Sequence, residues 1–330
     1  MIPVAQFTTF LESMSTKWAD SQRSPAPQSS QPDPEKLWIA AIKPPMYSVA
    51  VIPIWVGSAI AWAETGRIDY GIFSCFLSAS IAIVAWLNLS NDVFDADTGI
   101  DKNKPHSLVN LTQNRPLIFW IANGLLVLGL LGIVSIAWQQ GDGTVLIIVG
   151  LCCALGYSYQ GPPFRLGYRG LGEPICFVTF GPLAVSAAYY SQTQTWGWSP
   201  IAASVIVGIS TSLILFCSHF HQIEDDAAAG KRSPIVRLGT ERGAQIIPWL
   251  CGSLFGITGL GIFLGLFPIQ TVAVLLTIPA AYRLARHVQD YHDCPAKVSR
   301  AKFIAVTLHF WSGVMLGCGW LLSLAQARLG

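Results

Sequence analysis

Apolar runs, each about 20 residues long, recur along nearly the whole of this chain. A helix of that length crosses the hydrocarbon core of a bilayer and satisfies its own backbone hydrogen bonds there. Hydrophobic residues make up 52% of the 330 residues and charged residues 12%, whereas soluble domains carry roughly 25% charged residues. The sequence therefore predicts an all-α, polytopic membrane protein.

We expect about nine transmembrane helices. They cover roughly residues 39–62, 70–90, 116–138, 144–160, 172–192, 200–220, 244–264, 267–286 and 303–325. The distribution of Lys and Arg supports this count, because cytoplasmic loops are enriched in these two residues. Nearly all of the 20 Lys and Arg residues fall on one side of nine spans, and only Arg67 and Arg328 fall on the other. The N-terminus and the charged loops are therefore expected on the cytosolic or stromal side.

Residue composition also indicates the domain organisation and argues against a nucleic-acid partner, a zinc site and a disulfide framework. Residues 1–35 are rich in Ser, Pro and Gln and are expected to be disordered, whereas residues 36–330 form the transmembrane domain. A net charge of +2 without a basic patch indicates no nucleic-acid partner. The eight cysteines show no CxxC spacing, so neither a zinc site nor a disulfide framework is indicated.

A polar stretch begins at the end of the second expected span, in NLSNDVFDADTGIDKNKP, residues 88–105. If these residues continue the helix, Asn88, Asp92 and Asp95 are spaced i, i+4 and i+7 and lie on one face. A carboxylate at a membrane boundary is costly unless it is paired, hydrated or bound to a cation. The cluster therefore predicts a functional site.

A second stretch, HFHQIEDDAAAGKRSP, follows the sixth expected span and repeats this layout of acids, a glycine and then bases. Its acids are Glu224, Asp225 and Asp226, and its first base is Lys231. His219 and His221 point to nearly opposite faces of a helix, so we expect helix capping or a substrate hydrogen bond from them rather than a shared metal.

The two stretches together suit a ligand that carries a diphosphate. Mg²⁺ prefers oxygen ligands and usually joins one or two carboxylates to substrate phosphates. The expected metal ligands are Asp92, Asp95, Asp226, Glu224 and Asp225. Lys102, Lys104 and Lys231 lie beside these acids and suit phosphate oxygens. The apolar bundle would hold the rest of the ligand, so a lipid diphosphate is the expected substrate class.

The residues after the second span resemble a known family. NDVFDADTGID is similar to the first aspartate-rich motif of the UbiA-type membrane prenyltransferases, written NDxxDxxxD, and nine helices is the architecture of that family. YSYQGPPFRLGYRGLGE after the fourth span and the stretch after the sixth resemble the branch that acts on 1,4-dihydroxy-2-naphthoate, in its cyanobacterial and plastid form. The resemblance covers the chain from about residue 36 to its end.

The resemblance implies a role for individual residues. Asn91, Asp92 and Asp95 take the first Mg²⁺ and diphosphate site, and Asp226 takes the later acid of the second motif, so these four are the expected catalytic residues. The chain departs from the pattern at Gly99 and Gln222, where the family has acids. The expected substrate-binding residues are Asn88, Lys102, Lys104, Tyr157, Arg165, Gln222 and Lys231.

The reaction implied by the resemblance is Mg²⁺-dependent transfer of a phytyl or other prenyl group from its diphosphate to 1,4-dihydroxy-2-naphthoate. CO₂ and diphosphate are lost, and the product leads to phylloquinone or menaquinone. The expected location is a cyanobacterial or plastid membrane, within the membrane lipid. Homogentisate and 4-hydroxybenzoate are alternative aromatic acceptors. A cation-coupled transporter and an inactive scaffold are alternatives of other classes, and acids gathered at one membrane face argue against transport.

Overall fold

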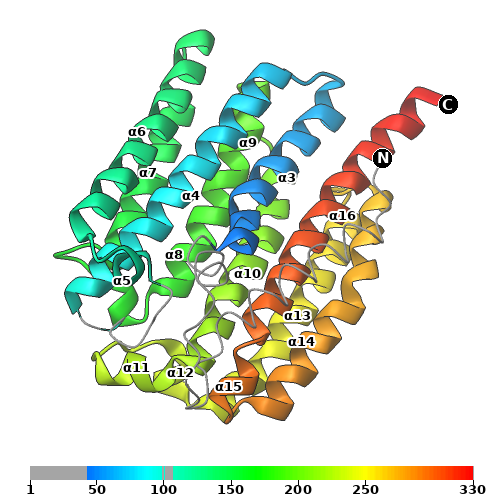
Figure 1. The fold of residues 1–330 in the computed structure, drawn as a ribbon. Coiled ribbons are helices and arrows are strands. Elements are labelled where there is room, and N and C mark those ends of the chain that lie inside the picture. The colour runs from blue at the N-terminus through cyan, green and yellow to red at the C-terminus, as the bar shows by residue number, and fades with distance from the viewer. Residues whose placement is uncertain (1–42, 99, 101–106, 330) are drawn as a thin grey trace.

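The computed structural model describes residues 43–98, 100 and 107–329, and every regular element in these ranges is a helix (Figure 1). The expected disordered segment, residues 1–35, lies outside the described residues, as do Gly99, Lys102 and Lys104. The elements are η1 (Pro44–Tyr47), α3 (Ser48–Thr65), α4 (Tyr70–Thr98), α5 (Leu108–Thr112), α6 (Arg115–Gln140), α7 (Thr144–Gln160), η2 (Leu166–Arg169), α8 (Gly172–Val178), the π-helical η3 (Thr179–Leu183), α9 (Ala184–Thr193), α10 (Trp198–His221), α11 (Ile223–Ala228), α12 (Pro234–Leu238), α13 (Thr240–Phe263), η4 (Ile269–Thr277), α14 (Ile278–Tyr291), α15 (Pro295–Val298) and α16 (Ala301–Leu329).

Each of the nine expected spans has a helical counterpart within the described residues. Seven of these helices are long and apolar enough to cross a membrane, with α8, η3 and α9 joined into one of them. The other two counterparts are α7, an apolar helix of 17 residues, and the combination of η4 and α14. The prediction of a polytopic helical membrane protein is therefore confirmed.

α3 occupies the centre of the bundle, because its residues are shared between two buried clusters. Ile52, Val56 and Ile60 pack in a cluster with α10, α13, α14 and α16, whereas Ile54 packs in a second cluster with α4, α6 and α7. α9 also contributes to both clusters. The first described span therefore joins the two halves of the bundle.

α3 approaches two of its neighbours closely. A Cβ atom on Gly57 would lie 2.4 Å from the carbonyl oxygen of Val185 on α9, so only glycine permits this contact. On its other side, Ile52 fills the space above Gly313 of α16, and Trp55 Nε1 donates to the carbonyl oxygen of Val314 at 3.4 Å. Small residues that let helix backbones approach are a main source of packing in membranes.

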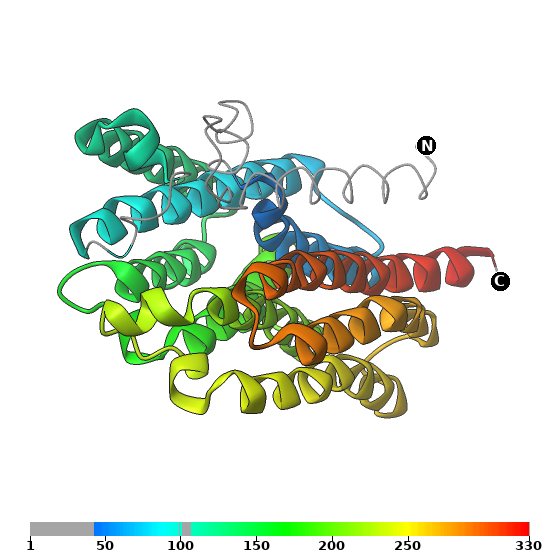
Figure 2. The same ribbon diagram turned by 60° about the horizontal axis from the view of Figure 1, so that its bottom comes forward.

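The two acidic stretches lie at the same end of the bundle. α11, α12 and α15 lie at the bottom of Figure 1 near the C-terminal end of α10, α5 lies at the left beside the C-terminal end of α4, and Figure 2 turns this end forward. The opposite end carries short turns such as the one between α6 and α7. α4 continues to Thr98, eight residues beyond the expected span end at residue 90, so its acids are carried by a rigid helix rather than by a loop.

The contact between α3 and α9 predicts a specific weak point. We expect Gly57→Ala to lower the free energy of unfolding by about 1–3 kcal/mol, because the added methyl group overlaps the α9 backbone. Thermal unfolding in detergent measures the change. Gly252→Ala on α13 is the matched control, since no described atom lies within 4 Å of its added methyl group. Equal stability of the two variants would contradict the prediction.

Candidate active site

The first acidic group lies on one face of α4, as the spacing predicts. Asp92 and Asp95 are 4% and 8% exposed, although both carry carboxylates. Asp92 is held by two groups: Lys43 Nζ lies 3.1 Å from its Oδ1, and the backbone N–H of Leu108 donates to its Oδ2 at 3.0 Å. The hydroxyl of Tyr168 donates to Asp95 Oδ1 at 3.5 Å. Both buried carboxylates are therefore stabilised by partners from distant parts of the chain.

The second acidic group is a chain of four side chains around Asp226, which is 1% exposed. Asp226 Oδ1 lies 3.2 Å from Lys231 Nζ, and Asp226 Oδ2 lies 2.9 Å from His219 Nδ1. The other ring nitrogen of His219 lies 3.3 Å from Glu173 Oε1. The buried imidazole thus stands between a carboxylate of α11 and a carboxylate at the start of α8.

Charge partners decide the ionisation of Asp226. Burial alone would raise the pKa of this carboxyl group, but the hydrogen bond from His219 and the charge of Lys231 outweigh burial, and the pKa lies below its ordinary value. Asp226 is therefore a carboxylate at neutral pH and keeps the charge that a cation or a phosphate-bound metal requires.

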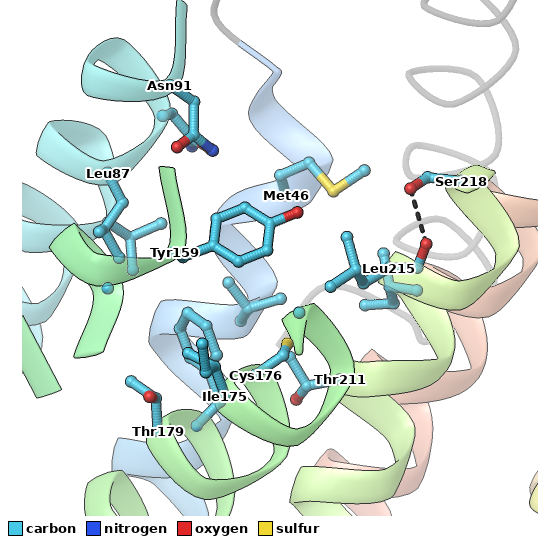
Figure 3. A pocket seen from close by; sticks show the side chains of 17 residues that line it. Met46, Leu87, Asn91, Tyr159, Ile175, Cys176, Thr179, Thr211, Leu215 and Ser218 are labelled. Carbon is cyan, nitrogen blue, oxygen red and sulfur yellow. Dashed lines mark hydrogen bonds between the residues drawn. The ribbon is translucent and has the colours of Figure 1, made fainter. Parts of the chain in front are cut away.

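The lining of a cavity of about 220 Å³ includes sequence neighbours of both groups, Asn91 next to Asp92 and Ser218 next to His219 (Figure 3). Its lining is mostly apolar, and its polar side chains include Asn88 and Asn91 from α4 and Tyr159 from α7. A second pocket of about 50 Å³ shares five lining residues with it and extends further into the bundle. The shared residues are Val49, Val84, Leu87, Thr179 and Phe180.

The other expected site residues differ in their burial and in their contacts. Arg165 has a left-handed backbone conformation and a buried Nε without a hydrogen-bond partner among the described residues. The hydroxyl of Tyr157 donates to the carbonyl oxygen of Pro162 at 2.8 Å, and this side chain does not line the cavity. Gln222 is half-buried at the junction of α10 and α11. Glu224 is exposed, and Asp225 is half-buried.

The residues present fit a magnesium site in which the substrate supplies the remaining oxygen ligands. In the described part of the chain, no three His, Cys, Asp or Glu side chains group closely enough to hold a metal by themselves. Mg²⁺ does not require such a group, because it keeps several waters and combines one or two carboxylates with phosphate oxygens. The buried carboxylates Asp92, Asp95 and Asp226 supply the hard oxygen atoms for this kind of site.

Four residues of the site have contacts that the sequence did not predict. Lys43 and Glu173 are distant in sequence from the acids that they serve, and only the fold brings them close. His219 was expected to cap a helix or bind substrate, whereas it bridges two carboxylates. Tyr159 is two residues from Tyr157 and so points to the opposite face of α7. The buried cation Lys231, by contrast, was expected and lies at the site.

Comparison with known proteins places the chain in a family. The sequence profile of the UbiA prenyltransferase family matches residues 50–322, so the chain belongs to this family of membrane enzymes. The chain is therefore a prenyltransferase and not a transporter. The chain is 56% identical over 300 residues to the 2-carboxy-1,4-naphthoquinone phytyltransferase of Synechocystis sp., an alignment that covers 91% of this chain and 98% of that protein. It is 42% identical to the chloroplastic 2-carboxy-1,4-naphthoquinone phytyltransferase of Arabidopsis thaliana, over 86% of this chain and 76% of that protein.

Solved structures confirm the fold. A UbiA homolog from Aeropyrum pernix K1 matches with a TM-score of 0.62 at 16% identity and covers 85% of this chain and 98% of its own. A UbiA homolog from Archaeoglobus fulgidus, solved with DMAPP and Mg²⁺, matches with a TM-score of 0.57 at 13% identity, over 87% of this chain and 99% of its own. The UbiA-type bundle expected from the sequence is therefore present.

The bridge at His219 predicts a measurable stability loss. His219→Leu would leave Glu173 and Asp226 facing an apolar side chain, and we expect the free energy of unfolding to fall by about 3 kcal/mol, as for a broken buried ion pair. Adding Glu173→Gln should recover part of this loss, because the second change removes a buried charge that has lost its partner. Chemical unfolding of the single and double variants measures the coupling. Simple addition of the two effects would show that His219 does not serve both carboxylates.

Proposed function

We propose that this chain transfers a phytyl group, or another prenyl group, from its diphosphate to 1,4-dihydroxy-2-naphthoate, with loss of CO₂ and diphosphate, in the synthesis of phylloquinone or menaquinone. The observation that carries the proposal is a mostly apolar cavity whose lining includes the sequence neighbours of two buried acidic groups, Asn91 next to Asp92 and Ser218 next to His219. The carboxylated naphthalene skeleton of the acceptor is supported by the names of the relatives from Synechocystis and Arabidopsis, which give its quinone form.

The acidic end of the cavity would hold the diphosphate. Asp92, Asp95 and Asp226 would bind Mg²⁺, which supplies positive charge to the departing diphosphate. Lys43 and Lys231 each lie against one of these carboxylates at 3.1 and 3.2 Å. With Mg²⁺ bound to the carboxylates, the ammonium groups of Lys43 and Lys231 would be available to the phosphate oxygens. The same lysines would then stabilise the acids without substrate and the diphosphate with it.

The apolar end of the cavity would hold the prenyl chain. Its walls come from α3, α4, α7, α8 and α10, and the second pocket gives the chain a path deeper into the bundle. Exclusion of water matters because ionisation of the allylic diphosphate produces a carbocation that water would capture. Of the cavity-lining residues, Tyr159 and Phe180 are the aromatic ones, and an aromatic face close to the cation would stabilise it further.

The acceptor ring must reach the prenyl carbon that loses diphosphate. After the C–O bond to diphosphate has broken, the electron-rich ring carbon that bears the carboxylate attacks the allylic cation and forms the new C–C bond. The C–CO₂ bond then breaks, its electron pair restores the aromatic ring, and CO₂ leaves. Prenylated naphthoquinol, CO₂ and diphosphate are the balanced products, and no oxidant is required.

The proposed location is a cyanobacterial or plastid membrane, with the acidic end of the bundle on the cytosolic or stromal side. The Lys and Arg side chains of the loops at this end support the orientation, and the relatives named above are cyanobacterial and chloroplastic.

The proposed reaction predicts metal-dependent product formation. Membranes that contain the protein should convert 1,4-dihydroxy-2-naphthoate and phytyl diphosphate to prenylated product and CO₂ with Mg²⁺, and EDTA should abolish this turnover. Liquid chromatography with mass detection measures the product. Turnover with homogentisate or 4-hydroxybenzoate, but not with the naphthoate, would overturn the choice of acceptor.

Substitution of either aspartate of α4 is expected to reduce turnover without reducing the amount of folded protein. Asp92→Ala and Asp95→Ala should each lower kcat on the order of 100-fold or more, because a group that stabilises developing charge is removed. Initial rates and the amount of folded protein in the membrane are measured together. Asp290→Ala is the matched control, since Asp290 is an exposed acid of α14 that pairs with Arg286 at 3.6 Å. Near-normal rates in both α4 variants would remove these aspartates from the mechanism.

A further inference from the structure

Two of the four hydroxyl groups of the cavity lining are already satisfied by backbone. Thr211 Oγ1 donates to the carbonyl oxygen of Val207 at 2.8 Å, and Ser218 Oγ donates to that of Leu215 at 2.7 Å (Figure 3). Thr179 Oγ1 is buried without a partner, and the hydroxyl of Tyr159 also has no hydrogen-bond partner among the described residues. A phenol that projects into a cavity without a partner is available to a ligand.

Tyr159 stands where the polar and apolar parts of the cavity meet. Figure 3 shows its ring in the middle of the lining, with Asn91 and Leu87 to one side and Met46 and Leu215 to the other. Asn91 adjoins Asp92 in sequence, and Ser218 adjoins His219, so the cavity runs next to both acidic groups. The ring of Tyr159 therefore lies between the asparagine end of the cavity and its apolar part, where the bond between the two substrates would form.

The fold holds this ring in one place. A Cβ atom on Gly167 would lie 2.7 Å from Tyr159 Cε2, and a Cβ atom on Gly172 would lie 2.8 Å from the same atom. Both glycines belong to the stretch GPPFRLGYRGLG, and their missing side chains leave the space that the ring edge occupies. A side chain fixed in this way loses little conformational entropy when it binds a ligand.

We propose that Tyr159 binds the aromatic acceptor: its hydroxyl hydrogen-bonds an oxygen substituent of the ring and holds the reacting carbon beside the first carbon of the prenyl group. The inference rests on the proposed function and names a residue for acceptor recognition. The ligand class is a planar aromatic acid with hydroxyl groups, because a prenyl chain offers no oxygen atom. Tyrosine has an ordinary pKa near 10, so its hydroxyl is a donor at neutral pH.

Tyr157 is the rival residue on the same helix. Its hydroxyl already donates to Pro162, and its ring meets Phe94 edge to face, with ring centroids 5.8 Å apart, outside the cavity. The two tyrosines therefore make opposite predictions about acceptor binding, and conservative variants that remove only the hydroxyl distinguish them.

The test compares Tyr159→Phe with the wild-type enzyme in full-length protein. We expect kcat/KM for 1,4-dihydroxy-2-naphthoate to fall about 10-fold or more, which is the size expected when a hydrogen bond to a charged oxygen atom is lost. The KM for phytyl diphosphate should stay unchanged. Tyr282→Phe is the matched control, because Tyr282 is an exposed tyrosine of α14 far from the cavity lining. Calorimetric binding of the naphthoate to both proteins gives a second readout that needs no turnover.

Three results would overturn the inference. They are an unchanged naphthoate affinity in Tyr159→Phe, a raised KM for phytyl diphosphate in place of the naphthoate effect, and the naphthoate effect in Tyr157→Phe alone. Failure of the proposed function is distinct, since it would be seen in the wild-type enzyme as absence of naphthoate turnover. If the wild type uses another aromatic acceptor, the same comparison with that acceptor decides the role of Tyr159.

Discussion

Buried carboxylates at one end of the bundle are the constraint on which the rest of the structure depends. Such groups are tolerated at a membrane boundary only when charge partners and hydrogen bonds compensate for lost water. The partners come from distant segments: Lys43 precedes α3, Leu108 begins α5, and Glu173 begins α8. Satisfying the acids therefore also fixes the ends of several helices around the cavity mouth, so the fold and the site are built by the same contacts.

The sequence predicted the spans and the acidic groups because both signals are local. Apolar run length defines a span, and i, i+4, i+7 spacing places Asn88, Asp92 and Asp95 on one face wherever the helix continues. The partners of these acids were out of reach, since the pairing of Lys43 with Asp92 depends on how α3 and α4 pack. The selection of Tyr157 followed a family motif in the sequence, whereas the orientation of Tyr159 follows from the rotation of α7 within the bundle.

Gln222 stands where the family pattern has an acid, and the fold shows which other acid lies close to Asp226. Among the acids nearest in sequence, Glu224 is exposed, and Asp225 is half-buried. The carboxylate that shares a buried partner with Asp226 is Glu173, which lies about fifty residues earlier and reaches His219 from the start of α8. The second acidic group thus contains two acids that contact the same imidazole, although Glu173 belongs to α8 and Asp226 belongs to α11.

The packing of α3 against α16 has a consequence for how the protein is made. Ile52 and Trp55 of the first described span meet Gly313 and Val314 of the last. During synthesis the first span enters the membrane long before its partner exists, and contacts between such distant segments form slowly. One side of α3 must therefore remain covered by lipid or by the insertion machinery until α16 has been inserted. Completion of the core is tied to the insertion of α16.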